Sequence, residues 1–120
     1  MKIAISSAGE TLESRVDPRF GRSAFFVLID TDTGAVSAHD NAQNLNAAQG
    51  AGIQSAQTVS RLGAEVVITG HCGPKAFRAL RAAGIQVAVG PDGTVAEAVE
   101  QFKSGKLLPS EAADVEGHWA

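Results

Sequence analysis

The sequence predicts an α/β protein in which a mixed five-stranded sheet lies between two layers of helices, a three-layer α/β/α fold. Up to about residue 40, the apolar residues occur in the short runs and alternations typical of β-strands. From about residue 48 onward, amphipathic runs with helical spacing alternate with β-branched runs. Strands that alternate with helices pair in parallel through right-handed crossovers, which places helices on both faces of a sheet. The predicted order of elements is βββαβαβα.

Three strands are expected before the first helix. Residues 2–6 and 24–30 form short apolar runs, and residues 35–40 alternate weakly between apolar and polar side chains. Between the second and third strands, the turn from Thr31 to Gly34 ends in a glycine that can adopt a positive φ, which favours a hairpin.

Glycines at a fixed spacing mark the βα units that follow. Gly63, Gly84 and Gly105 are each 21 residues apart (84 − 63 and 105 − 84), and each follows an amphipathic run. Glycine is typical of the end of a helix, where the chain turns through the left-handed region. The β-branched runs after the first two glycines predict strands at residues 64–69 and 85–89.

Three helices are expected between these strands and after them. The first covers about residues 48–62, the second begins at Pro74, and the third follows a capping box formed by Thr94 and Glu97. Proline suits a first helical position because its missing N–H would be unpaired there anyway.

Length and composition indicate one globular domain. The chain has 120 residues, of which 44% are hydrophobic and 19% charged, and its mean hydropathy is close to zero. The domain is expected to span residues 1–107, and the polar stretch at 108–120 is predicted to be a flexible tail. The first apolar run is too short for a signal peptide or a membrane span.

The charge and cysteine content limit the partners. Ten Lys and Arg against thirteen Asp and Glu give a formal charge of −3, which disfavours binding to nucleic acid or to an anionic membrane. An anion site must therefore be a local basic patch. A single cysteine excludes an internal disulfide and a four-cysteine metal site, and it suits a reducing compartment, so a cytoplasmic location is expected.

Ligands of open α/β sheets bind where the carboxyl ends of parallel strands meet. Four segments are predicted to converge at that edge: residues 7–23, 41–49, 70–75 and 90–93. The segment at 70–75 is the most specific of them, because Gly70 and Gly73 let the backbone approach a ligand and a helix begins directly afterwards. The helix N-terminus would favour an anion. A tight βα turn without a ligand is the alternative interpretation.

Side chains at this edge offer charge and metal contacts. His71 and Cys72 are candidate metal or sulfide contacts, and Lys75 adds a positive charge. A buried cysteine beside a solvated histidine is about as plausible from chemistry alone, because free cysteines are usually buried.

An arginine-rich stretch after the first strand is the second candidate. Arg15, Arg19 and Arg22 are opposed there only by Asp17. Surface ion pairs that merely order the loop are the alternative. Asn44 lies in an amide-rich approach to the first helix, where helix caps and turns are the usual explanation.

The sequence lacks the residues that several classes of enzyme require. No Asp or Glu stands on the first strand or at the end of the fourth, where a two-metal nuclease needs carboxylates for ions about 4 Å apart. Walker and dinucleotide-binding motifs are absent. A Cys72 nucleophile with His71 as its base is weak, since adjacent residues of an extended loop point in different directions.

Several motifs in order resemble the dinitrogenase iron–molybdenum cofactor biosynthesis family. The resemblance covers about residues 1–107. Its motifs are VDPRFGRSAFF at residues 16–26, NAQN at 41–44 leading to GAGI at 50–53, VVITGHCGPKAF at 66–77, and AGIQV at 83–87.

The resemblance implies a ribonuclease H-like fold without nuclease activity, and binding or transport of a metal–sulfur cluster without catalysis. The cluster it implies foremost is an anionic molybdenum–copper sulfide held largely without covalent protein ligands; an iron–molybdenum cofactor precursor is the alternative. Sheet-edge geometry, not the resemblance, selects the binding residues, with His71 and Cys72 as metal contacts: Arg19, Arg22, Asn44, Gly70, His71, Cys72, Gly73 and Lys75. A regulatory or scaffold module for partner ATPases, with a vestigial pocket, is the alternative function.

Overall fold

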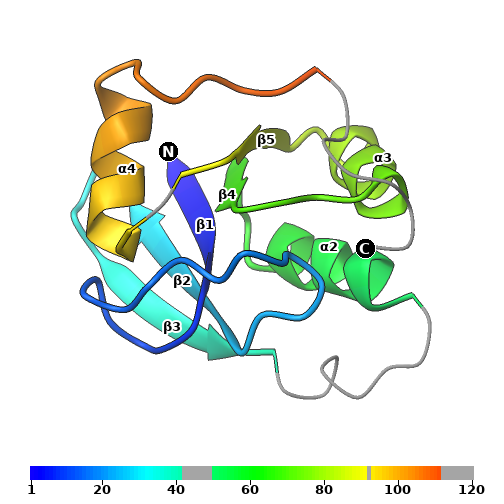
Figure 1. The fold of residues 1–120 in the computed structure, drawn as a ribbon, viewed down its shortest axis with the longest axis horizontal. Coiled ribbons are helices and arrows are strands. Elements are labelled where there is room, and N and C mark those ends of the chain that lie inside the picture. Colours follow the sequence, from blue (N-terminus) through cyan, green and yellow to red (C-terminus); the bar gives the residue numbers. More distant parts are fainter. Residues whose placement is uncertain (42–49, 92, 112–120) are drawn as a thin grey trace.

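The computed structural model of the protein describes residues 1–41, 50–91 and 93–111. It confirms the predicted fold class and the order βββαβαβα (Figure 1). The strands are β1 (Lys2–Ser7), β2 (Phe25–Asp30), β3 (Val36–Asp40), β4 (Val66–Thr69) and β5 (Gln86–Val89). The helices are α2 (Ala51–Arg61), α3 (Pro74–Ala82) and α4 (Val95–Lys103).

The five strands form one mixed sheet in the order β3-β2-β1-β4-β5. β1 pairs antiparallel with β2, and β2 pairs antiparallel with β3, through the predicted hairpin. β1 and β4 are parallel, as are β4 and β5. The carboxyl ends of β1, β4 and β5 therefore lie at one edge of the sheet, which is where open α/β sheets bind ligands.

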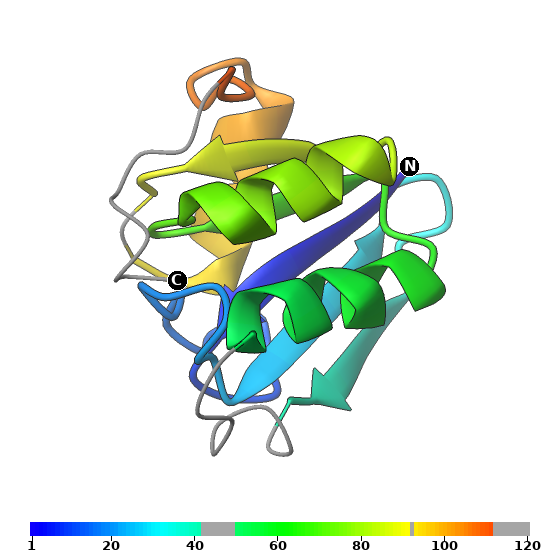
Figure 2. The ribbon, with the colours of Figure 1, turned by 90° about the vertical axis from the view of Figure 1, so that its right-hand side faces the viewer.

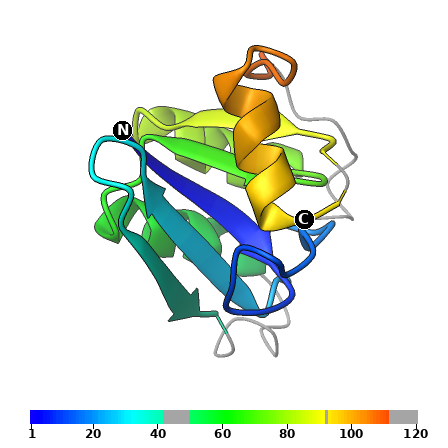
Figure 3. The ribbon, with the colours of Figure 1, turned by 90° about the vertical axis from the view of Figure 1, so that its left-hand side faces the viewer.

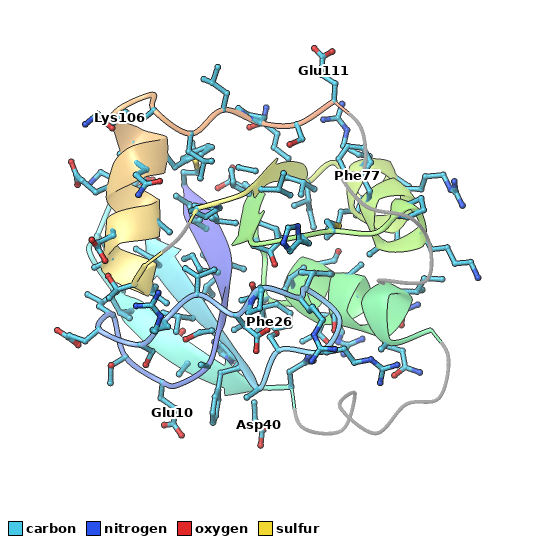
Figure 4. The ribbon with its side chains drawn as sticks, viewed as in Figure 1. Glu10, Phe26, Asp40, Phe77, Lys106 and Glu111 are labelled. Carbon is cyan, nitrogen blue, oxygen red and sulfur yellow. The ribbon has the colours of Figure 1, made fainter. Side chains whose placement is uncertain are left out.

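Helices cover both faces of the sheet. α2 and α3 lie side by side on one face (Figure 2), and α4 lies on the other (Figure 3). Phe26 of β2 and Phe77 of α3, both labelled in Figure 4, belong to the core between the sheet and α2 and α3. A second core, with Ile5 of β1 and Val95 of α4 among its buried residues, fills the opposite side. Burying a side chain of this size stabilises a fold by roughly 1.5–3 kcal/mol.

The helix ends follow the predicted signals. In α4, the Glu97 N–H donates to Thr94 Oγ1 at 3.2 Å and the Thr94 N–H donates to Glu97 Oε1 at 2.9 Å, which is the predicted capping box. Gly63, Gly84 and Gly105 all adopt positive φ, between 79° and 84°, directly after the helices. α2 begins at Ala51 with Gly50 as its N-cap, and the predicted start near residue 48 lies outside the described residues.

The segment after α4 stays on the body of the protein for several residues beyond the predicted domain boundary at 107. Leu107 packs against the core on the α4 side, and the Ser110 N–H donates to the Val87 carbonyl of β5 at 2.6 Å. Of the predicted tail, residues 112–120 lie outside the described part of the chain.

Candidate functional site

The long loop that follows β1 folds back across the carboxyl edge of the sheet. Its backbone is held to three elements: the Asp17 N–H donates to the Ser6 carbonyl at 2.9 Å, the Val16 N–H to the Gly93 carbonyl at 2.9 Å, and the Phe20 N–H to the His71 carbonyl at 3.3 Å. Isolated bridges join Arg19 to His71 and Arg15 to Thr94. The loop therefore lies directly beside the β4–α3 and β5–α4 connections. The sequence predicts that these three segments meet at the carboxyl edge of the sheet.

Two groups of buried polar side chains fix this loop from below. The Ser6 hydroxyl lies 2.7 Å from Thr69 Oγ1 and 2.8 Å from the Asp17 carbonyl oxygen. Further along, Asn41 Nδ2 donates to the Ser23 carbonyl at 3.0 Å and to the Ser55 hydroxyl at 3.2 Å. These bonds tie the loop to β1, β4, the end of β3 and α2, so its arginines are presented from an ordered backbone.

Two glycines allow the backbone to approach its neighbours closely. A Cβ added to Gly70 would lie 2.6 Å from Pro18 Cα and 2.8 Å from the Pro18 carbonyl oxygen. A Cβ on Gly21 would lie 2.8 Å from the backbone nitrogen of Gly52, in the first turn of α2. At both places backbone packs against backbone, so glycine is required.

A pocket of about 400 Å³ opens between the loop and the ends of β4 and β5. Its lining combines two basic side chains with backbone and apolar walls: Arg15, Val16, Pro18, Gly70, His71, Gly90 and Pro91. Arg15 and His71 are both exposed to solvent. A pocket of this size suits a small molecule or a small cluster.

The structure places two of the predicted binding residues, Gly70 and His71, in the pocket lining. Cys72 lies elsewhere: its side chain is 1% exposed and belongs to the core under α2 and α3, and its thiol donates to the Gly73 carbonyl at 3.7 Å. Cys72 therefore contributes packing at this position, the alternative that the sequence left open. Gly73 is the N-cap of α3.

The other predicted residues that the structure describes do not line the pocket. Arg19 is exposed next to His71, Arg22 is half-buried, and Lys75 is exposed in the first turn of α3. Asp17 caps the loop, since its Oδ1 accepts a hydrogen bond from the Arg19 N–H at 3.0 Å. Asn44 lies outside the described residues.

Sequence reasoning left Arg15, Gly90 and Pro91 out of the list of binding residues. The sequence predicts residues 90–93 at this edge and Arg15 in the basic stretch, but no sequence signal sets Arg15 apart from Arg19. The folded chain does so, because Arg15 lines the pocket whereas Arg19 pairs with His71 without lining it.

The helix ends at this edge differ in charge. α3 begins without a side-chain cap and with no acidic residue in its first turn, whereas α4 carries Glu97 there. The N-terminus of α3 thus keeps its positive end next to Lys75.

Within the described ranges, no three His, Cys, Asp or Glu side chains are grouped so that they could hold a metal ion. In the same residues, no helix is long and apolar enough to cross a membrane.

Comparison with known proteins identifies the family. The family model described as dinitrogenase iron–molybdenum cofactor matches residues 1–105. The chain belongs to this family. The match includes every segment that forms the pocket and confirms the resemblance seen in the sequence motifs.

Several known proteins are similar to this chain, two of them in a solved structure. The apo form of the orange protein from Desulfovibrio gigas is 42% identical, with a TM-score of 0.93, over 95% of this chain and 96% of that one. A putative NifB protein from Thermotoga is 34% identical, with a TM-score of 0.80, over 95% and 98% of the two chains. An uncharacterised protein of Methanocaldococcus jannaschii is 28% identical over 96 residues, 78% of this chain and 81% of that protein.

Proposed function

We propose that the protein binds and carries an anionic metal–sulfur cluster at the carboxyl edge of the sheet, as a carrier, store or sensor and without catalysing a reaction. A molybdenum–copper sulfide is the cargo we favour, and an iron–molybdenum cofactor precursor is the alternative. The observation that carries the proposal is the pocket, whose lining combines Arg15 and His71 with glycine and proline residues.

The charge distribution supports an anion at this place. The whole chain has a formal charge of −3, so its overall field does not attract an anion. Attraction has to come from local groups: Arg15 lines the pocket beside Thr94, exposed Arg19 pairs with His71, and exposed Lys75 lies in the first turn of α3. Each exposed charge contact contributes roughly 0.5–1.5 kcal/mol, so these charges act together with the backbone N–H donors of the loop and the direct contact at His71.

The chemistry of the lining supports a sulfide-rich anion. A cluster whose metals already carry sulfide needs positive charge and N–H donors from the protein more than a full set of ligands. Sulfide is large and polarisable, so Val16, Pro18 and Pro91 are suitable neighbours. His71 is the side chain we propose for direct contact with a metal, because it is exposed in the lining.

The relatives support the same class of cargo. The description of the family names the iron–molybdenum cofactor. The orange protein from Desulfovibrio gigas was solved in an apo form, which implies that this relative also has a form with a bound group. With 42% identity over nearly the whole of both chains, a shared class of ligand is the simplest expectation.

The proposal is tested by isolating the protein under non-denaturing, anaerobic conditions and measuring its metals, acid-labile sulfide and visible absorption. We expect molybdenum or iron together with sulfide in constant ratio, and an absorption band that elutes with the protein. The metal-free protein should regain that band when thiomolybdate and copper are added. A colourless protein that takes up neither, although correctly folded, would refute the proposal and favour a regulatory or scaffold role.

A further inference from the structure

The helices α2 and α3 carry a charge opposite to that of the whole protein. The chain has a formal charge of −3, yet residues 41–91 contain four Lys and Arg and a single carboxylate, Glu65. Glu65 is turned toward the start of β1, where its Oε2 accepts a hydrogen bond from the Lys2 N–H at 2.9 Å. The two helices themselves contain no acidic residue. They are therefore basic, although the molecule is acidic.

Three of the charges form a row along α3, which we call the basic row: Lys75, Arg78 and Arg81. All three side chains are exposed. They follow one another at intervals of three residues, so successive Cβ atoms lie about 5–6 Å apart on one side of the helix. Arg61, in the last turn of α2, is also exposed. α2 and α3 lie side by side and lead into the parallel strands β4 and β5, so Arg61 and Arg81 lie at the same end of the two helices (Figure 2).

The basic row is unfavourable for the helix that carries it. Like charges three residues apart on a helix repel each other. Lys75 lies in the first turn of α3, where the helix dipole disfavours a cation. Within the described ranges, no carboxylate forms an ion pair with any residue of the row. Negative groups of a partner, placed between these charges, would relieve the repulsion.

The other residues of this face favour a protein as the partner. Ala79 and Ala82 lie among the basic side chains, and their small size lets a second helix come close. A guanidinium group donates two parallel hydrogen bonds to a carboxylate, which suits the two arginines of the row. In the described residues of α2 and α3, no exposed aromatic side chain is available to stack on bases, and Ile53 is the only large apolar side chain exposed for insertion into a membrane.

We propose that the basic row, together with Arg61, is a docking surface for a protein that presents a carboxylate-rich helix. The partner lies along α3 with one end beside the pocket, because α3 begins three residues after His71, which lines the pocket. It is then placed to deliver or receive the cargo. This last step rests on the proposed function, whereas the docking surface does not.

NMR titration of the full chain, as isolated, with a helical peptide of about 15 alanine and glutamate residues tests the proposal. At low salt, amide signals of residues 74–82 and of the end of α2 should shift as peptide is added. Because salt screens exposed charges, the affinity should fall about tenfold or more when the salt is raised from roughly 20 to 300 mM.

Two charge-reversal variants separate the basic row from the overall field. Arg78→Glu with Arg81→Glu should weaken peptide binding about tenfold or more. Lys103→Glu with Lys106→Glu changes the net charge equally, from −3 to −7, on the α4 side of the molecule, where Figure 4 labels Lys106. All four side chains are exposed, so both variants should remain folded. The second variant should bind the peptide within about twofold of the wild type.

The proposal is overturned if both variants lose affinity equally, or if the peptide shifts signals away from α2 and α3. Tighter binding of this face to duplex DNA or to phosphatidylglycerol vesicles than to the peptide would also overturn it. So would a shift of the signals of residues 74–82 in Asp114→Asn with Glu116→Gln before peptide is added, because acidic residues of the chain itself would then occupy the row. The titration contains no cluster, so its result does not depend on whether the proposed function holds.

Discussion

Gly70 is packed so tightly against Pro18 that a side chain has no room between them. This contact joins the end of β4 to the arginine loop and forms part of the pocket wall. A shift of the loop would therefore also displace Arg15 from the pocket.

We expect Gly70→Ala to lower the free energy of unfolding by about 2–3 kcal/mol, since a Cβ 2.6 Å from a backbone atom forces the loop to move. Urea unfolding measures the loss. Gly34→Ala is the control: it has open space but a φ of 80°, so it should cost only about 1 kcal/mol. Equal losses at both positions would show that the contact with Pro18 is unimportant.

Cys72 and His71 are neighbours in the chain, but their environments differ. The thiol lies in the core, whereas the imidazole is exposed in the pocket lining. Cys72→Ala should lower stability by about 1 kcal/mol through lost packing and weaken cluster binding only slightly, through the shift of the loop packed above it. His71→Ala should weaken binding while leaving stability unchanged. Absorption after gel filtration and urea unfolding separate the two effects. Complete loss of the cluster from a folded Cys72→Ala protein would establish the thiol as a direct ligand.

Among the elements, the start of β1 is joined to the β2–β3 hairpin through the chain terminus. The Met1 ammonium lies 2.8 Å from Asp32 Oδ2 and 3.9 Å from Asp30 Oδ1. The hydrogen bond to Asp32 raises the pKa of the ammonium above 8.0. The hydrogen bond from the Asp32 N–H lowers the pKa of Asp30 below 3.8.

These shifts predict how stability depends on pH. A raised ammonium pKa stabilises the fold below the unfolded value of 8.0, and this contribution disappears as the pH rises through the folded value. The lowered pKa of Asp30 stabilises the fold above 3.8, and this contribution disappears as the pH falls. Urea unfolding at pH 7 and above pH 9 should show a small loss in the wild type and a smaller one in Asp32→Asn. The same loss in both would contradict the ion pair.

The elements also show what local sequence can predict. The helix starts at Pro74 and Thr94 and the turns at Gly63 and Gly84 depend on neighbouring residues, and all of them were predictable. The burial of Cys72 and the place of Arg15 in the pocket depend on segments that meet only in the folded chain. Adjacent residues of a loop point in different directions. The sequence could therefore place the loop at this edge without showing which of its side chains faces the pocket.

At the scale of the whole molecule, both cores are closed by side chains alone. Helices on each face of the sheet bury apolar residues from all the strands but β3. We therefore expect the metal-free protein to be folded, with a well-dispersed two-dimensional NMR spectrum. A spectrum that becomes dispersed only when metal and sulfide are added would contradict this expectation, because folding would then depend on the cluster.

We propose that local charge at one edge of the sheet, and not the overall field of the protein, binds the cluster. Arg15→Glu with Arg19→Glu changes the net charge from −3 to −7, and so does Arg61→Glu with Arg81→Glu, on exposed helix positions in α2 and α3. After reconstitution with thiomolybdate and copper, the affinity measured by retained absorption should fall on the order of a hundredfold in the first variant and change little in the second. Equal losses in both variants, or no loss in either while both remain folded, would show that local charge at this edge does not bind the cluster.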